Sequence, residues 1–176
     1  MTQPTQPRPF GAFNPDAPTL VVTTGLPGSG KSTWAIEWVN EDPTARVRLE
    51  RDLFRTMLHG TAHHGQTWQE LQVNAAIRHA ALGLLSAGHS VVISATNVRR
   101  TDLIRWAQWG WTCAGANFFV RSFWDVPLST CIMRNDARKG TAEYVPEDVI
   151  RTMHHDGWSD RGAATAPVGY WSGVPA

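Results

Sequence analysis

Residues 25–33 hold the feature that most constrains the fold. This glycine-rich segment matches the phosphate-binding loop pattern G-x-x-x-x-G-K-[ST] at every fixed position. The β-branched run 19–24 before it predicts a buried strand, and apolar residues at helical spacing after it predict a helix over 31–41. A strand, a glycine loop and a helix in this order let backbone N–H groups converge on phosphate oxygens at a helix N-terminus.

The loop predicts a site for ATP or another nucleoside triphosphate. Lys31 is expected to reach the β- and γ-phosphates, and the Ser32 hydroxyl is expected to ligate Mg²⁺. The residues predicted to bind the nucleotide here are Gly28, Ser29, Gly30, Lys31, Ser32 and Thr33.

Size and composition favour one small domain without a membrane anchor. The chain has 176 residues, with 16 basic and 15 acidic side chains, so its net charge does not point to a nucleic-acid partner. Two cysteines provide no disulfide framework. The first residues are rich in Pro and Gln, and no long apolar stretch follows, so we expect a cytoplasmic protein with no membrane span.

Strand and helix patterns alternate along the chain. Strands are expected at 19–24, 45–49, 90–94 and 116–123, and helices at 31–41, 52–59, 67–87, 101–109, 125–138 and 146–154. This order predicts an α/β fold, a parallel β-sheet flanked by helices on both faces. Residues 1–17 are expected to form a flexible arm, 18–155 the domain, and 156–176 a tail.

Helical spacing also predicts which residues face the core. In 52–59 we expect Leu53 and Met57 to face inward, together with Phe54. In 67–87 we expect one apolar face made of Leu71, Ala75, Leu82 and Leu85.

The end of the second predicted strand offers groups for an acceptor. Ligands of open parallel sheets gather at the carboxyl ends of the strands. Asp52 follows such an end, where a carboxylate can take a proton from an attacking hydroxyl or can cap the next helix. Arg55 lies one turn further on, where it suits an acceptor phosphate or simply forms a solvated charge.

Two further segments carry candidate groups. The strand 90–94 ends without the acidic residue that many P-loop ATPases place there, and Thr96 and Asn97 either turn the chain or contact substrate. Arg134 and Arg138 are four residues apart near a predicted helix C-terminus, a position that favours cations in any helix. They also suit a lid over the triphosphate, with Arg138 stabilising the charge on the transferred group.

Through the motifs described above, residues 20–154 resemble the 5′-kinase domain of the polynucleotide kinase family. The combination of Arg-Asp-x-x-Arg and Arg-Asn-x-x-Arg is far more specific than the phosphate-binding loop alone. The resemblance rests on five pieces in the same order: the loop from Gly25, Arg-Asp-x-x-Arg from Arg51, Thr-Asn at Thr96, Asp-Val-Pro at Asp125, and Arg-Asn-x-x-Arg from Arg134 followed by Val-Pro at Val145.

The resemblance implies ATP- and Mg²⁺-dependent transfer of the γ-phosphate to the 5′-hydroxyl end of DNA or RNA. It also implies an adenylate-kinase-like P-loop fold with a C-terminal helical lid. Asp52 matches the general base of the family, and Arg138 matches the lid arginine, supported by Arg134. The implied catalytic set is Lys31, Asp52 and Arg138, and the implied acceptor-binding set is Arg51, Arg55, Thr96 and Asn97.

The chain departs from the family pattern at two positions. Ala95 stands where some members carry an acidic residue, and Lys139 is inserted before the lid glycine. No D-x-D-x motif of a phosphatase domain is present, so we expect no 3′-phosphatase activity.

Two other functions fit the same loop. A small-molecule kinase for an antibiotic, a sugar or a nucleoside also places an aspartate after the second strand. Arg55 distinguishes the two, because a neutral acceptor needs no cation beside its hydroxyl. A non-catalytic nucleotide-binding module needs neither Asp52 nor Arg55.

Overall fold

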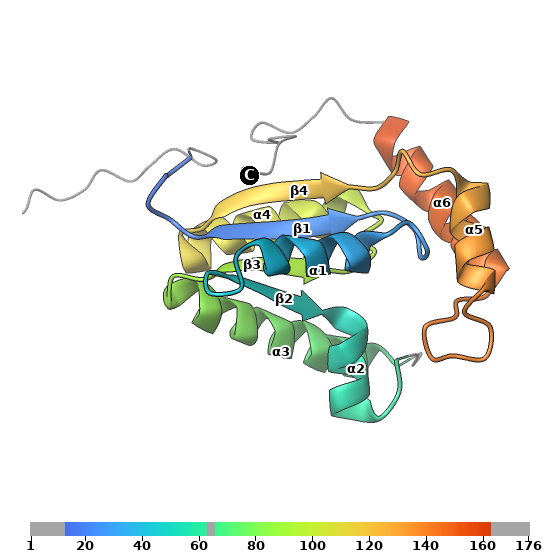
Figure 1. Ribbon diagram of the computed structural model, residues 1–176, viewed down its shortest axis with the longest axis horizontal. Coiled ribbons are helices and arrows are strands. Elements are labelled where there is room, and N and C mark those ends of the chain that lie inside the picture. The colour runs from blue at the N-terminus through green and yellow to red at the C-terminus, as the bar shows by residue number, and fades with distance from the viewer. Residues whose placement is uncertain (1–12, 63–65, 163–176) are drawn as a thin grey trace, which may run out of the picture.

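The computed structural model describes residues 13–62 and 66–162 (Figure 1). The first twelve residues of the predicted arm, and the predicted tail from residue 163, lie outside the described residues. Within the described ranges the elements follow the order β1 (Thr19–Thr24), α1 (Lys31–Glu41), β2 (Arg46–Glu50), α2 (Arg51–His59), α3 (Thr67–Ser86), β3 (Ser90–Ser94), α4 (Arg100–Ala114), β4 (Asn117–Ser122), α5 (Leu128–Asp136) and α6 (Glu147–Gly162).

The four strands described form one parallel sheet in the order β2-β3-β1-β4. Leu20 in β1 pairs with Val91 in β3 and with Phe118 in β4, which places β1 inside the sheet. All strands therefore end at the same edge, and the expected α/β fold is confirmed.

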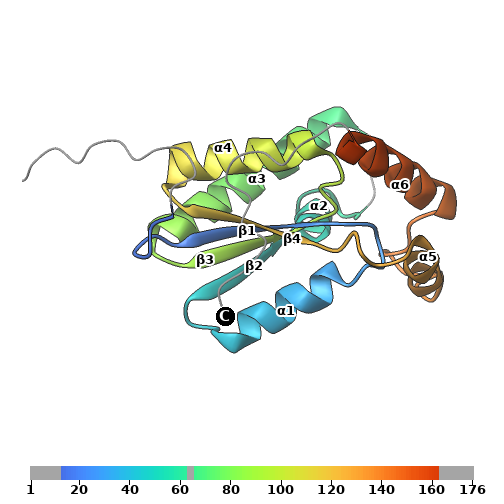
Figure 2. The same ribbon diagram turned by 90° about the horizontal axis from the view of Figure 1, so that it is seen from above.

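Side chains of β1 alternate between two cores on opposite faces of the sheet. Leu20 and Val22 pack with α3 and α4, whereas Val21 packs with Ala35 and Trp38 of α1. Figure 2 shows α1 on one face and α3 and α4 on the other. Both faces of the central strands are covered, and this explains their continuous apolar sequences.

Two helices are longer than predicted. Helix α4 runs through Gly110 to Ala114, because Gly110 lies against the Leu20 side chain, where a Cβ atom would come within 2.8 Å of it. Gly115, with φ of 60°, then ends the helix. Helix α6 continues to Gly162, so the segment predicted as a tail begins inside a helix. None of the described helices is both long and apolar enough for a membrane span.

The predicted core faces of α2 and α3 are partly wrong. Leu53 and Met57 are 57% and 68% exposed, and only Phe54 of the three packs against the core. Helix α2 lies beyond the carboxyl end of the sheet, where there is little core to face (Figure 1). In α3 Leu71 and Ala75 are exposed, and the buried stripe is Val73, Ile77, Ala81 and Leu85.

Helices α5 and α6 lie together at the carboxyl end of the sheet (Figures 1 and 2). Their shared core contains Leu26 of the glycine loop together with Cys131 and Ile150. The Trp124 indole donates a hydrogen bond to Thr24 Oγ1 at 2.9 Å and packs on α6 at Gly157. The two helices are therefore anchored directly to the loop and to β1.

The contact between Gly157 and Trp124 predicts opposite effects for one substitution at two helical glycines. A Cβ atom at Gly157 would lie 2.5 Å from the Trp124 ring, so Gly157→Ala should lower the free energy of unfolding by about 1–3 kcal/mol. Gly83 in α3 has open space around it, so Gly83→Ala should raise the free energy of unfolding by about 0.5–1 kcal/mol. Urea unfolding of both variants checks this, and equal effects would contradict the packing described.

Candidate active site

The glycine loop connects the end of β1 to the start of α1. Gly28 and Gly30 have φ of 78° and 99°, a left-handed conformation that other residues rarely adopt. A Cβ atom at Gly28 would also collide with the carbonyl oxygen of Cys131 in α5. Ser29 is buried beneath the loop, whereas Thr33 is exposed on the first turn of α1. The loop therefore has the open backbone curvature that phosphate binding requires.

Lys31 extends back into the loop from the first residue of α1. Its side chain is 8% exposed, and its Nζ donates hydrogen bonds to the Leu26 carbonyl at 2.5 Å and to Ser29 Oγ at 3.3 Å. The ammonium group thus lies inside the curve of the loop, where the phosphates of a nucleotide would lie.

The pKa of Lys31 shows which charged groups surround it. Burial lowers this pKa from its usual 10.5 to about 8. Cys131, Asp52 and Glu50 oppose the lowering of the pKa, and Arg138 adds to it. Groups from β2, α2 and the segment after α5 therefore lie within electrostatic reach of one lysine, and the catalytic roles of Asp52 and Arg138 stay predictions.

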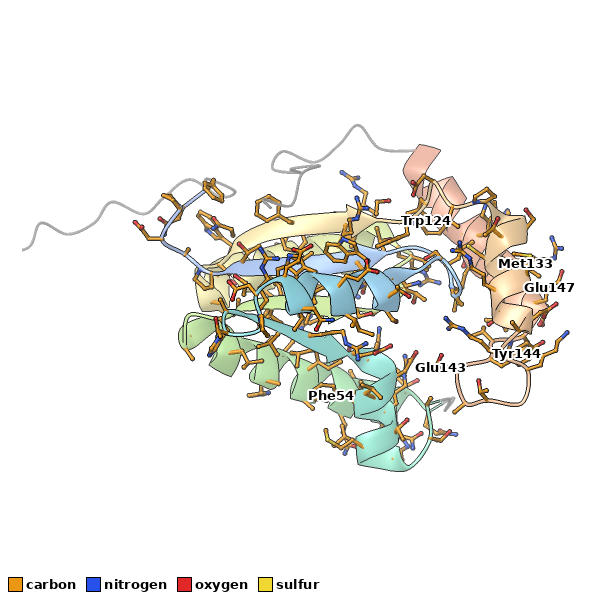
Figure 3. All side chains as sticks on the ribbon, in the orientation of Figure 1. Phe54, Trp124, Met133, Glu143, Tyr144 and Glu147 are labelled. Carbon is orange, nitrogen blue, oxygen red and sulfur yellow. The ribbon has the colours of Figure 1, made fainter. Side chains whose placement is uncertain are left out.

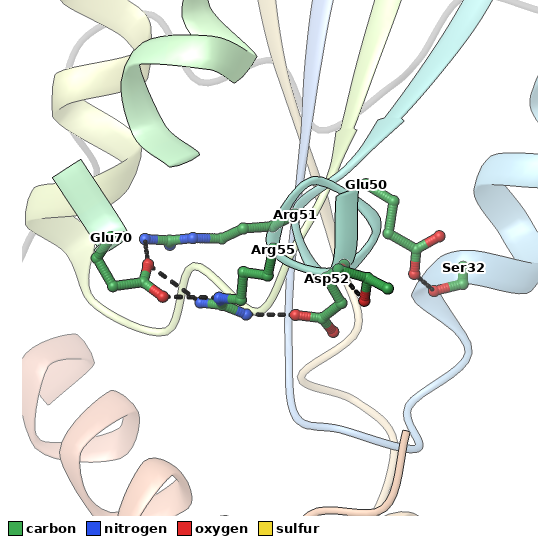
Figure 4. A network of polar contacts seen from close by, with 7 residues as sticks. Ser32, Glu50, Arg51, Asp52, Arg55 and Glu70 are labelled. Atoms are coloured by element: carbon green, nitrogen blue, oxygen red, sulfur yellow. Dashed lines mark hydrogen bonds and ion pairs between the residues drawn. The ribbon is translucent and has the colours of Figure 1, made fainter. Parts of the chain in front are cut away.

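Ser32 lies beside a carboxylate that the sequence analysis did not assign. Its Oγ donates a hydrogen bond to Glu50 Oε1 at 3.1 Å (Figure 4). The same Oγ lies 3.5 Å from Ser94 Oγ. Glu50 also forms an ion pair with Arg48. Glu50 ends β2 in register with Ser94, which ends β3. The end of β3 carries no acidic residue, and a carboxylate from the end of the neighbouring strand β2 lies beside it.

These oxygen atoms fit a hard divalent cation. Mg²⁺ in kinases is held by one or two protein oxygens together with substrate phosphates and waters. Ser32 and Glu50 provide such oxygens next to the loop. No group of three or more His, Cys, Asp or Glu among the described residues could hold a metal ion, so the cation would depend on the nucleotide for its remaining ligands.

Asp52 lies on the first turn of α2 and does not cap it. The N-cap residue is Glu50, and no side chain makes a capping hydrogen bond there. The Asp52 side chain is 56% exposed, and its Oδ1 accepts a hydrogen bond from Arg55 Nη1. An exposed carboxylate within electrostatic reach of Lys31 is available to an incoming hydroxyl group.

Glu70, from the first turn of α3, binds both arginines of α2. Arg55 donates from Nε at 2.7 Å and from Nη2 at 3.2 Å, and Arg51 donates from Nη2 at 2.6 Å (Figure 4). Partial burial raises the pKa of Glu70, but the hydrogen bonds and charges of the two arginines outweigh this effect and hold it below its usual value. Burial likewise lowers the pKa of Arg55, and Glu70 and Asp52 raise it overall.

The loop after β3 is hydrogen-bonded to the end of β1. Asn97 is buried with φ of 39°, and its Nδ2 donates to the Thr23 carbonyl at 3.0 Å. Its carbonyl accepts a hydrogen bond from Thr24 Oγ1 at 2.9 Å, and the Thr96 carbonyl accepts one from Gly25 N at 3.0 Å. Thr96 and Asn97 thus support the start of the glycine loop, and their contact with substrate stays a prediction.

Arg138 lies at the start of a loop whose two ends are joined by the buried side-chain amide of Asn135. Asn135 Nδ2 donates to the Val145 carbonyl at 2.6 Å, and Val145 N donates to Asn135 Oδ1 at 3.0 Å. Glu143 lies on this loop (Figure 3). Arg138 forms an ion pair with it at 3.4 Å. Arg134 is exposed on α5. In the sequence Asn135 is only one residue of the Arg-Asn-x-x-Arg motif, whereas in the structure its two hydrogen bonds join the ends of the loop.

A family model described as AAA domain (AAA_33) matches residues 20–156. The chain belongs to this family. Its parallel sheet, glycine loop and flanking helices are those of a kinase-like P-loop domain. The P-loop part of the predicted fold class is therefore confirmed.

Solved structures of three kinds of protein are similar to this chain. A chain of the Pnkp1/Rnl/Hen1 RNA repair complex is 25% identical with a TM-score of 0.75, over 86% of this chain and 48% of that one. This domain thus spans about half the length of that protein. APS kinase CysC from Mycobacterium tuberculosis, in complex with AMPPNP and APS, is 27% identical with a TM-score of 0.55, over 69% and 70% of the two chains. A gluconokinase from Sinorhizobium meliloti 1021 shares the fold at 20% identity, with a TM-score of 0.51, over 79% of this chain and 74% of that one.

Because Lys31 carries a buried charge, we expect a neutral side chain at this position to raise the free energy of unfolding. Below pH 8 the lysine is charged in both the folded and the unfolded protein. Because its pKa is lower in the folded state, the buried charge lowers the free energy of unfolding by about 3 kcal/mol there. Lys31→Met also loses two hydrogen bonds, so we expect a net gain of about 1–3 kcal/mol at pH 7. The gain should shrink between pH 8 and 10.5, where the folded lysine is already neutral and the unfolded one still charged.

Urea unfolding at pH 7 and pH 10 measures this difference. The exposed lysine at position 139 is the matched control, and Lys139→Met should leave the free energy of unfolding nearly unchanged. A Lys31→Met variant that is less stable than the wild type at pH 7 would contradict the buried charge.

Proposed function

We propose that this domain transfers the γ-phosphate of ATP to the 5′-hydroxyl end of a DNA or RNA strand. The observation that carries the proposal is the placement of Asp52 within electrostatic reach of Lys31, with Arg55 bonded to its carboxylate. A general base next to a cation suits an acceptor hydroxyl that has a phosphate nearby. The similarity to a chain of an RNA repair complex supports the same acceptor class.

The donor half of the reaction uses the glycine loop and its lysine. Backbone N–H groups around Gly28 and Gly30 surround the triphosphate, and the Lys31 ammonium group neutralises the charge of its terminal groups. Ser32 and Glu50 would hold Mg²⁺, and the bound cation would supply further positive charge to the phosphates. Arg138 stabilises the charge that develops on the transferred group.

The acceptor half uses α2. Asp52 takes the proton of the 5′-hydroxyl as this oxygen attacks the γ-phosphorus in line with the leaving oxygen. Arg51 and Arg55 orient the acceptor through the phosphate that follows its terminal sugar. Most of the rate enhancement then comes from positioning and charge, as in other phosphoryl transfers.

A small-molecule kinase remains the second candidate, favoured by the APS kinase similarity over comparable lengths of both chains. Incubation with γ-labelled ATP separates the two functions when three acceptors are compared: a 5′-hydroxyl oligonucleotide, the same oligonucleotide with a 5′-phosphate, and a free nucleoside. We expect label on the first acceptor only. Label on the free nucleoside alone would support a small-molecule kinase, and label on none would contradict the proposed function.

Asp52→Asn should abolish transfer and spare nucleotide binding. The amide keeps the shape of the side chain but cannot take a proton, so the transfer rate should fall about 10²–10⁴-fold. The affinity for ATP, measured by calorimetry, should stay within about twofold because Asp52 binds no phosphate in this account. A comparable loss of ATP affinity would instead assign Asp52 to the nucleotide site.

Glu50→Gln should weaken the contribution of Mg²⁺ to nucleotide binding. We expect the Mg²⁺-dependent gain in affinity for AMPPNP to fall about 10–100-fold, because a neutral amide is a poor partner for the cation. Binding without Mg²⁺ should not weaken. Glu41→Gln is the matched control, since Glu41 also pairs with an arginine of β2 but lies at the far end of α1. An unchanged Mg²⁺ effect in Glu50→Gln would exclude Glu50 from the metal site.

A further inference from the structure

We propose that Glu70 is the positioning residue that orients Arg51 and Arg55 toward the phosphate of the acceptor. The inference rests on the proposed function and assigns a role to a residue outside the glycine loop and its catalytic carboxylate. Glu70 belongs to α3, whereas both arginines belong to α2, so the contact links the two helices (Figure 4).

The contact fixes the plane of the Arg55 guanidinium group. Glu70 accepts hydrogen bonds from Nε at 2.7 Å and Nη2 at 3.2 Å, which is a two-point contact along one edge. Asp52 accepts a third hydrogen bond, from Nη1. Because a guanidinium group has five N–H donors, one donor on Nη1 and one on Nη2 stay available. In the proposed role, these two donors bind the phosphate of the acceptor.

Glu70 also keeps two like charges together. Arg51 and Arg55 are one helical turn apart on α2, where two cations repel each other. The Glu70 carboxylate binds both, and all three side chains are 21–28% exposed, so solvent screens their charges only in part. Without this carboxylate the arginines would separate, and each would lose conformational entropy on binding a phosphate.

The same contact limits how strongly Arg55 pairs with Asp52. In the absence of Glu70, Asp52 would be the only described carboxylate bound to Arg55. The arginine would then compete with the acceptor hydroxyl for the group that must take its proton. Loss of Glu70 should therefore affect acceptor use and leave the donor site, on α1 and β2, unchanged.

Glu70→Gln tests the role, because the amide retains the size of the side chain and loses its charge. We expect KM for a 5′-hydroxyl oligonucleotide to rise about tenfold, which is typical when a residue that orients a binding group is lost. KM for ATP should stay within about twofold. Glu41→Gln, which breaks an ion pair of the same type between α1 and β2, should change neither KM. In a background that carries both Arg51→Ala and Arg55→Ala, Glu70→Gln should have little further effect, because Glu70 acts through these two arginines.

A structural readout accompanies the kinetics. The Nε–H of Arg55 should give a slowly exchanging NMR signal in the wild type, and this signal should exchange faster in Glu70→Gln but not in Glu41→Gln. If thermal unfolding shows that Glu70→Gln does not fold, Glu70→Asp replaces it and should show the same changes, because the shorter carboxylate cannot reach both arginines.

The possible results are distinguishable. A wild-type protein that labels no 5′-hydroxyl oligonucleotide overturns the proposed function, and the role of Glu70 with it. A Glu70→Gln variant that labels the oligonucleotide with unchanged KM overturns the role of Glu70 alone. Equal increases in KM for the oligonucleotide and for ATP also overturn it, because they indicate a general structural effect.

Discussion

A buried ammonium group organises this end of the molecule. Lys31 carries its charge inside a glycine loop that leaves it two hydrogen-bond partners, Leu26 and Ser29. Burial lowers its pKa, so an anionic ligand beside it would offset part of the cost of keeping this charge away from water. The carboxylates of Glu50 and Asp52 lie close enough to offset part of this cost, and both come from the neighbouring end of β2 and start of α2.

The parallel sheet explains why these groups meet. Strands β1, β2 and β3 all end at one edge, so the loop after β1, the carboxylate at the end of β2 and Ser94 at the end of β3 become neighbours. Helices α5 and α6 close the same edge because Leu26 packs in their core. The topology also separates the proposed groups: those for the donor lie on α1, on β2 and on the loop between β1 and α1, and those for the acceptor lie on α2 and α3.

The sequence predicted those parts of the site that lie within one local motif. The glycine loop, Asp52 and Arg55 could be assigned because a strand end followed by a helix defines their place. Glu50, Glu70 and Asn135 could not, since their roles arise from contacts with Ser32, with Arg51 and Arg55, and with Val145 on other segments. Leu53 and Met57 misled the prediction of α2 because helical periodicity does not reveal that a helix extends past the sheet.

A crystal structure with AMPPNP, Mg²⁺ and a short 5′-hydroxyl oligonucleotide tests the central claim most directly. We expect an Asp52 oxygen to lie within hydrogen-bond distance of the terminal 5′-oxygen, and this 5′-oxygen to face the γ-phosphorus held by Lys31. We also expect Arg55 to contact the next phosphate. An oligonucleotide bound away from α2, or an Asp52 carboxylate turned away from the γ-phosphate, would contradict it.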